Sequence, residues 1–223
     1  MSGIHATKAV IFDMDGILIN SEPYWKTAEQ TVFSAHGIDP AIQQQLPDTT
    51  GLRIDQVVKL WLQVAGNKSV SAALITQQII DFVINKINEE RPLLPGVKHA
   101  LQLCQQSGVK IGLASASPIS MITTVVSLFE LTPYFITLSS AEALPYSKPH
   151  PQVYLNAAKA LGVDPLHCLA IEDSVNGMVA AKAARMKVFT VPAIEQAEWP
   201  VWSLADRKLP SLNALTLEML QGK

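Results

Sequence analysis

An uninterrupted apolar run near the start of the chain stops at two carboxylates. Residues Ala9–Phe12 are all apolar, which predicts a strand buried on both faces. Asp13 ends the run, and Asp15 follows one residue later, next to Gly16. A parallel strand brings its last residues to the carboxyl edge of the sheet, where open α/β folds bind ligands. The pattern therefore predicts a strand that delivers acidic groups to a site.

A helical pattern follows this strand. Ser21 is the expected N-cap of the first helix, which carries Pro23 in its first turn and has Gly37 beyond its end. Two further stretches repeat apolar residues at helical spacing, namely Arg53–Ala65 and Ala73–Ile87.

No convincing strand pattern interrupts residues 20–92, so we expect an all-helical insert there. We expect Trp25 and Trp61 to belong to its core and not to a ligand-binding surface. The proline-rich stretch Arg91–Gly96 is the expected return to the first part of the fold.

Strands and helices alternate after residue 93, which indicates βαβ units and a parallel sheet. The expected strands are 109–114, 135–138, 168–171, 187–191 and a short one within 204–209, with helices at 97–106, 119–129, 151–161, 175–184 and 215–220. The predicted fold is α/β, with a doubly wound parallel sheet and an inserted all-helical cap. The expected core domain is 1–19 with 93–223, and the expected cap domain is 20–92.

Composition supports a folded protein and limits its partners. The 223 residues are 48% hydrophobic and 16% charged, and the formal net charge is −2 with no basic run. We therefore expect no nucleic-acid partner and no anionic membrane partner. No secretory signal and no apolar run of about 20 residues is present, so we expect a cytoplasmic protein. A monomer is expected, with Cys104 and Cys168 as buried free thiols.

The spacing of Asp13 and Asp15 suggests metal-assisted chemistry. Two nearby carboxylates repel each other unless a cation lies between them or one keeps its proton. One aspartate then serves as nucleophile or ligand and the other as acid or base. The alternative is a simple turn, since Asp-x-Asp-Gly is a common turn sequence.

Each later strand also ends in polar residues. Ser115-Ala116-Ser117 follows the second strand, where a hydroxyl and backbone N–H groups are able to hold an anion. We expect Ser117 to cap the next helix as well. Lys148 lies in a stiff loop beside Pro149 and Pro151, although a solvated lysine is the default alternative.

A second acidic pair, Glu172-Asp173, ends the fourth strand. Asp173 or Ser174 is also suited to cap the following helix, which Gly177 weakens. In a parallel sheet, both acidic pairs, Ser115 and Lys148 lie at one edge.

These motifs, in this order, resemble those of the haloacid dehalogenase superfamily of phosphotransferases, and the resemblance covers nearly the whole chain. The helical insert between the first two motifs resembles the subgroup that includes β-phosphoglucomutase and small sugar phosphatases. Three sequence runs look most like bacterial 2-deoxyglucose-6-phosphate or hexitol phosphatases. They are Asp-Gly-Ile-Leu-Ile-Asn-Ser-Glu-Pro, Ala-Ser-Ala-Ser-Pro and Leu-Pro-Tyr-Ser-Lys-Pro-His-Pro.

The resemblance implies a Mg²⁺-dependent phosphatase of small sugar phosphates. Asp13 would attack phosphorus to form an aspartyl-phosphate, and Asp15 would act as general acid and then base. Mg²⁺ would be held by the Asp13 carboxylate, the Asp15 backbone carbonyl and Asp173, with Glu172 in support. The remaining phosphoryl oxygens would be bound by Ser115, the Ala116 N–H and Lys148.

Departures from the family pattern favour hydrolysis over mutase chemistry. Trp25 stands where the mutases have a histidine, and Pro118 and Ile119 replace the Lys-Asn pair that grips a second phosphate. Arg53 is a candidate substrate contact or a solvated residue. A mutase, a phospho-accepting signalling domain and a catalytically inactive scaffold remain alternatives.

Overall fold

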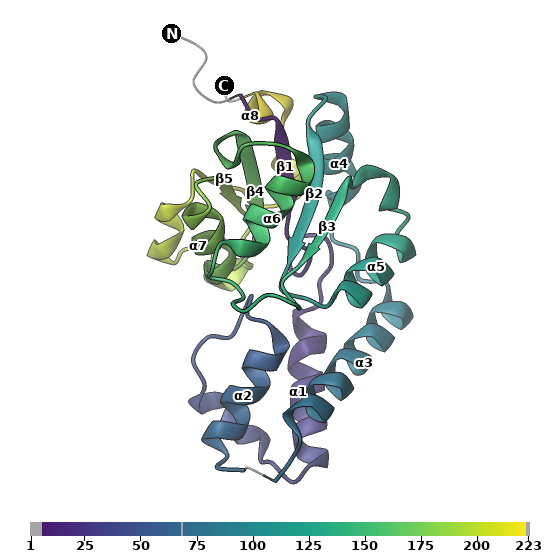
Figure 1. Ribbon diagram of the computed structural model, residues 1–223, viewed down its shortest axis with the longest axis vertical. Coiled ribbons are helices and arrows are strands. Elements are labelled where there is room, and N and C mark those ends of the chain that lie inside the picture. Colours follow the sequence, from purple (N-terminus) through teal and green to yellow (C-terminus); the bar gives the residue numbers. More distant parts are fainter. Residues whose placement is uncertain (1–5, 68, 222–223) are drawn as a thin grey trace.

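One parallel sheet organises the protein (Figure 1). The computed structural model describes residues 6–67 and 69–221, so the first five and last two residues of the expected core domain lie outside the described residues. The strand order is β3-β2-β1-β4-β5-β6, and every neighbouring pair is parallel. The strands are β1 Ala9–Phe12, β2 Lys110–Ser115, β3 Thr137–Ser140, β4 Cys168–Glu172, β5 Lys187–Thr190 and β6 Arg207–Lys208.

Helices cover both faces of the sheet, as the doubly wound prediction requires. Val10 and Phe12 of β1 pack with helices α4 and α5, whereas Ala9 and Ile11 pack with α6 and α7, because alternate side chains of a strand point to opposite faces. The helices are α1 Glu22–Ala35, α2 Ile54–Val64, α3 Ala72–Glu90, α4 Val97–Gln106, α5 Ile119–Leu128, α6 Gln152–Leu161, α7 Val175–Ala183 and α8 Leu217–Leu220.

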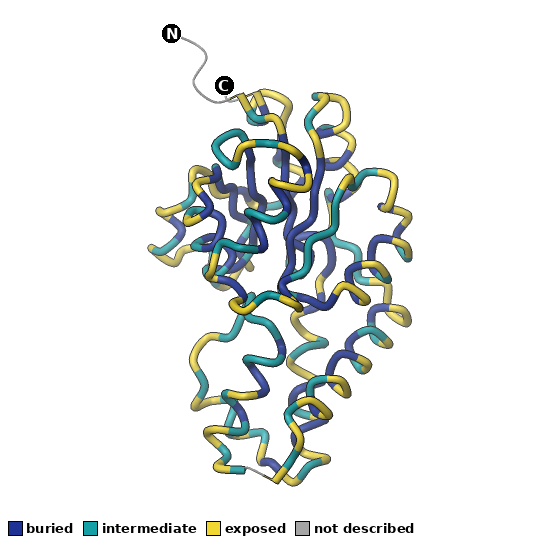
Figure 2. The backbone as a smooth tube through the Cα atoms, viewed as in Figure 1, coloured by how far each residue is buried: buried dark blue, intermediate teal, exposed yellow. Residues whose placement is uncertain are grey.

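Helices α1, α2 and α3 form the helical insert, which lies beyond the carboxyl edge of the sheet in the lower half of Figure 1. Their facing sides are buried while their outer sides are exposed (Figure 2). Trp61 is fully buried and stacks on Phe33, with ring centroids 4.3 Å apart. The prediction of a core position is confirmed for Trp61. Trp25 is partly buried, packs against the core and also lines a pocket.

The chain crosses between the sheet and the helical insert twice, at adjacent points. The Leu94 N–H donates to the Leu18 carbonyl at 2.9 Å, and the Asn20 N–H donates to the Pro92 carbonyl at 2.9 Å. Ile19 and Leu93 form an antiparallel bridge between these hydrogen bonds. The outgoing and returning segments are therefore paired with each other.

The largest differences from the expected strands are at β3 and β6. β3 begins at Thr137 and not at Phe135, because its register is set by pairing with Gly112 of β2, while Phe135 packs edge-to-face on Phe12. β6 contains only Arg207 and Lys208.

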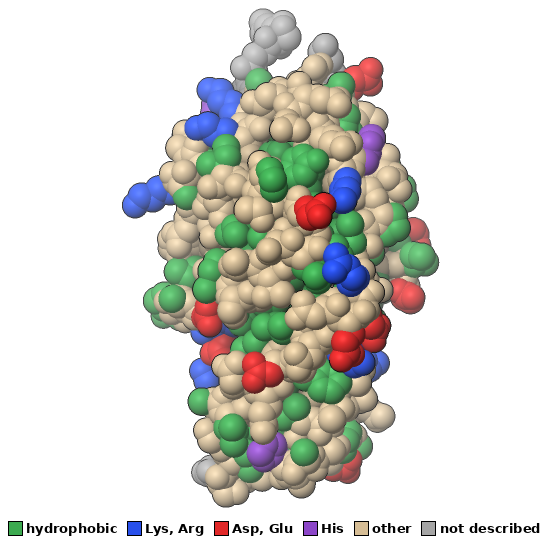
Figure 3. All heavy atoms as spheres, turned by 90° about the vertical axis from the view of Figure 1, so that its right-hand side faces the viewer, with side chains coloured by type: hydrophobic (Ala, Val, Ile, Leu, Met, Phe, Trp, Pro, Cys, Tyr) green, Lys and Arg blue, Asp and Glu red, His purple; other side chains and the backbone are tan. Residues whose placement is uncertain are grey.

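The buried thiols and the surface agree with a folded globular chain. Cys104 and Cys168 are free and buried, as expected. No helix within the described ranges is long and apolar enough to cross a membrane. On the face shown in Figure 3, acidic and basic side chains are interspersed over the sheet half and the helical half.

Candidate active site

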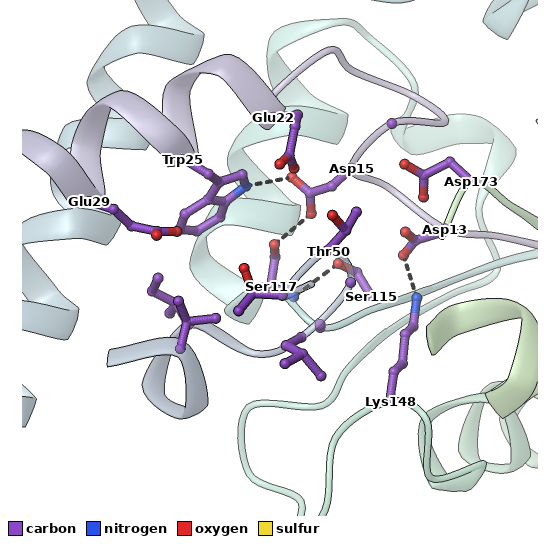
Figure 4. Close-up of a pocket in the computed structure, with 17 residues that line it drawn as sticks. Asp13, Asp15, Glu22, Trp25, Glu29, Thr50, Ser115, Ser117, Lys148 and Asp173 are labelled. Carbon is purple, nitrogen blue, oxygen red and sulfur yellow. Dashed lines mark hydrogen bonds and ion pairs between the residues drawn. The ribbon is translucent and has the colours of Figure 1, made fainter. Parts of the chain in front are cut away.

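Three adjacent strands bring polar side chains to the carboxyl edge of the sheet. Asp13 follows β1, Ser115 ends β2 and Glu172 ends β4. Because β1 pairs with both β2 and β4, these residues meet where the strand order reverses, which is the usual ligand site of open α/β sheets. A pocket opens there, between the edge of the sheet and the helical insert (Figure 4).

Lys148 lies at the base of this pocket and is 1% exposed. Its Nζ donates to Asp13 Oδ1 at 2.7 Å, to Glu172 Oε1 at 2.6 Å and to the Ala114 carbonyl at 3.2 Å. Burial alone lowers a lysine pKa, but the two carboxylates raise the pKa of Lys148 above its usual value. The solvated alternative is therefore wrong, and Lys148 is a fixed buried cation.

Glu172 holds this cation in position. Its Oε1 also accepts from the Tyr154 hydroxyl at 2.5 Å, and its Oε2 accepts from the Asp173 N–H and from the N–H and hydroxyl of Ser174. Ser174 caps α7 as well, because its Oγ accepts from the Gly177 N–H. Sequence reasoning missed Tyr154, which looks like an ordinary core residue of an amphipathic helix.

The Asp173 carboxylate accepts no hydrogen bond from any residue in the described ranges. It lies opposite Asp13 (Figure 4), so close to Gly16 that an added Cβ there would be 1.8 Å from Asp173 Oδ2. Burial and the nearby Glu172 and Asp13 charges raise the pKa of Asp173 well above its usual value.

The acidic cluster has more carboxyl groups than its single lysine neutralises. Oxygen atoms of Asp13, Glu172 and Asp173 lie within 4.8 Å of one another. Burial raises the pKa of Asp13 despite the adjacent Lys148. Since Glu172 is saturated with donors, Asp13 and Asp173 are the free oxygen ligands, a set that suits a hard divalent cation.

Asp15 is held on the other side of the pocket by three donors. Its Oδ1 accepts from the Ser21 hydroxyl at 2.5 Å and from the Trp25 Nε1–H at 3.1 Å, and its Oδ2 accepts from the Ser117 hydroxyl at 2.7 Å. Ser21 is the N-cap residue of α1, as predicted, but its hydroxyl donates to Asp15 and not to the helix. The predicted capping role of Ser117 is wrong, because Pro118 is the N-cap of α5 and the Ser117 hydroxyl donates to Asp15.

The remaining predicted phosphate ligands also line the pocket. Ser115 and Ala116 lie in its wall, and Ser115 Oγ accepts from the Ser117 N–H at 3.0 Å. Arg53 does not line this pocket. Its Nη1 instead donates to the Ala141 and Leu144 carbonyls, each at 2.7 Å.

Comparison with known proteins agrees with this fold and site. A family model described as haloacid dehalogenase-like hydrolase matches residues 7–185. The chain therefore belongs to the haloacid dehalogenase-like hydrolase family. It is 52% identical over 214 residues to hexitol phosphatase B of Escherichia coli, covering 96% of each chain.

Solved structures share the whole architecture. The β-phosphoglucomutase of Clostridium difficile matches with a TM-score of 0.83 and 26% identity, covering 97% of this chain and 96% of that one. The CbbY protein of Rhodobacter sphaeroides, solved with phosphate, matches with a TM-score of 0.83 at 22% identity, covering 97% and 100%. The second likeness supports the fold alone.

Proposed function

We propose that this protein is a Mg²⁺-dependent phosphatase of small phosphorylated sugars, acting on hexose or hexitol 6-phosphates such as 2-deoxyglucose 6-phosphate. The observation that carries the proposal is the grouping of Asp13, Lys148 and Asp173 opposite a separately held Asp15 in one pocket. The 52% identity to a hexitol phosphatase supports the substrate class.

Asp13 and Asp15 divide the chemistry. Asp13 attacks phosphorus, the bond from phosphorus to the sugar oxygen breaks, and Asp15 gives a proton to that oxygen. Asp15 then takes a proton from a water molecule that attacks the aspartyl-phosphate, which releases phosphate and restores Asp13. The Ser21, Trp25 and Ser117 donors keep Asp15 on the leaving-group side.

Mg²⁺ would be held by the Asp13 carboxylate, the Asp15 backbone carbonyl and Asp173. The excess of carboxylates at this point, with no donor on Asp173 in the described residues, supports that assignment. When bound, the cation supplies electrostatic stabilisation of charge on the phosphoryl group.

Ser115, the Ala116 N–H and Lys148 bind the phosphoryl oxygens in this proposal. Lys148 is suited to the task because Glu172 and Tyr154 already fix its environment. A preorganised cation needs little reorganisation as charge develops in the transition state.

The domain division is also a proposal, with residues 20–92 as a cap over a core of 1–19 and 93–223. The paired crossings near Ile19 and Leu93 support a hinge there. Closure of the cap would exclude bulk water during phosphoryl transfer.

Replacing the nucleophile tests the mechanism. Asp13→Asn is expected to lower kcat for phosphate release from sorbitol 6-phosphate by about 1,000-fold or more, because an amide does not attack phosphorus. Asp81→Asn, at an exposed position on α3, is the matched control and should retain full activity. Substantial turnover by a folded Asp13→Asn protein would refute the mechanism. Formation of phosphate isomers without phosphate release would favour the mutase alternative.

Metal binding is testable without turnover. Saturating Mg²⁺ should raise the melting temperature of the wild type, equivalent to about 2.7 kcal/mol at 100 times Kd. Asp173→Asn should lose most of this shift, whereas Asp81→Asn should keep it. A chelator should stop phosphate release and added Mg²⁺ should restore it. An Asp173→Asn protein with an undiminished Mg²⁺ shift would contradict the ligand assignment.

A further inference from the structure

The pocket has two chemically different ends. One end holds Asp13, Asp173 and Lys148 against the sheet, and the other extends along Trp25 to Glu29 of helix α1 (Figure 4). If phosphate lies at the sheet end, the rest of the substrate extends toward Glu29.

Glu29 is a buried acid with one oxygen left free. The residue is 7% exposed and lines the pocket. Its Oε2 accepts from the Trp61 Nε1–H at 3.0 Å, which orients the carboxyl group. No described residue forms a hydrogen bond with its Oε1. This oxygen is not one of the polar atoms that lack both a hydrogen-bond partner and contact with solvent. A ligand donor would therefore satisfy a group that otherwise costs free energy to bury.

The same end of the pocket contains no positive charge in the described residues. The apolar side chains of Leu52, Ile54 and Val57 also line the pocket, and Glu22 adds a second acid to it. Lys148 is the only cationic side chain among the described residues of the lining, and it is already paired with two carboxylates.

We infer that Glu29 is a specificity-determining residue, which binds the hydroxyl groups of a neutral polyol at the end remote from the phosphate. The same end rejects a substrate that carries a carboxylate or a second phosphate there. This inference rests on the proposed phosphatase function and names the substrate class of that site.

Hydrogen bonding and charge both favour a neutral polyol over a substrate with a carboxylate at this end of the pocket. At pH 8, above the pKa of about 7 that burial gives Glu29, the residue is mostly ionised. A polyol hydroxyl then donates to Glu29 Oε1, while a terminal carboxylate has no donor there and loses its water among apolar and acidic groups. A site that pairs a substrate hydroxyl discriminates strongly against analogues that cannot form the pair.

Two substrates that differ at one carbon test the inference in the wild-type protein. Sorbitol 6-phosphate and 6-phosphogluconate share the phosphate and the four central hydroxyl groups, but one ends in a hydroxymethyl group and the other in a carboxylate. At pH 8 we expect kcat/KM for phosphate release to favour sorbitol 6-phosphate by about 100-fold. This comparison requires no variant to fold.

Glu29→Gln then tests the residue, because its amide oxygen still accepts from Trp61 while its amide N–H₂ offers donors to a carboxylate. The preference for sorbitol 6-phosphate should fall by about 10-fold or more. The loss should exceed any loss on glycerol 3-phosphate, which has three carbons fewer. Glu89→Gln, at an exposed position on α3, is the control and should keep the wild-type preference.

The failures are distinguishable. No phosphate release from any of these compounds would overturn the proposed function. Efficient release from 6-phosphogluconate by the wild type, or an unchanged preference in folded Glu29→Gln, would overturn only the assignment of Glu29.

Discussion

The Glu29 carboxyl group illustrates how strongly burial changes the pKa of a single residue. Loss of solvation raises its pKa from 4.5 to about 7, the Trp61 N–H opposes this rise, and the Glu22 charge adds to it. The folded protein thus keeps a proton that the unfolded chain releases between about pH 4.5 and pH 7. The free energy of unfolding therefore falls as the pH rises through this window, by about 3 kcal/mol at most.

Glu29→Gln is expected to remove this loss. At pH 8 the variant should be about 1–3 kcal/mol more stable than the wild type, whereas at pH 5 the two should be nearly equal. Urea unfolding at both pH values measures the difference. Glu89→Gln should show no such pH-dependent gain. An equal stability change at pH 5 and pH 8 would show that the Glu29 proton is not responsible.

The site positions of residues that directly follow a strand were predictable from the sequence. Contacts between residues far apart in the chain were not. Asp13, Ser115 and Glu172 come directly at strand ends, so a parallel sheet alone implies that they meet. The Ser117 hydroxyl binds Asp15, 102 residues earlier in the chain. A serine before a helix looks like a cap, because its sequence neighbours reveal nothing about such a partner.

At the scale of elements, the junction between β4 and α7 explains a glycine within a helix. Gly177 has no side chain, and a Cβ there would lie 1.8 Å from Glu172 Oε1. Glycine normally weakens a helix by about 1 kcal/mol relative to alanine. Here the absence of a side chain leaves space for the Glu172 carboxylate, which positions Lys148.

Gly177→Ala should therefore be harmful despite its better helix propensity. We expect a loss of about 2 kcal/mol in stability, because Glu172 would lose hydrogen bonds as it moves. We also expect at least a roughly 10-fold fall in kcat. Thermal unfolding and phosphate release measure the two effects. Gly66→Ala is the control: its added carbon meets no atom within 4 Å, but its backbone is left-handed with φ 63°. It should therefore lose some stability and leave kcat unchanged. A fully active Gly177→Ala protein would contradict this account.

Hydrophobic periodicity predicted which segments are helices and which are strands. It predicted the first and last residues of these segments less well. Helix α4 occupies the expected residues 97–106, because its apolar positions and the following Gly108 both mark it. β3 was misplaced by two residues, since an edge strand takes its register from its neighbour and its own apolar run also serves tertiary packing.

At the scale of the whole molecule, polar links outside the catalytic residues join the helical insert to the sheet half, and Arg53 and Asn176 form two of them. Arg53 binds the carbonyls of Ala141 and Leu144, and the Asn176 side chain donates to the Thr50 carbonyl at 2.8 Å. These contacts join segments 88, 91 and 126 residues apart. The insert itself was predictable from the change in periodicity near residue 93, but these links were not.

Arg53→Ala is expected to favour the open arrangement of the proposed cap. Loss of its hydrogen bonds to the Ala141 and Leu144 carbonyls should lower kcat/KM by about 10-fold without changing the pocket lining. Phosphate-release kinetics and the radius of gyration from X-ray scattering are the measurements. Lys59→Ala removes an exposed partner of the same Asp55 and should have little effect. Wild-type kinetics in Arg53→Ala would exclude a role in closure.

The paired crossings at Leu18–Asn20 and Pro92–Leu94 also have an evolutionary consequence. The segment between them leaves the sheet half and returns to it at neighbouring points. It is therefore an inserted segment whose two ends are joined by backbone hydrogen bonds. A different inserted segment whose ends meet in the same way fits here without altering the order of the strands. Lineages that share this sheet are thus free to exchange the helical insert, which carries the proposed substrate contact Glu29, while inheriting the sheet edge that carries Asp13 and Lys148.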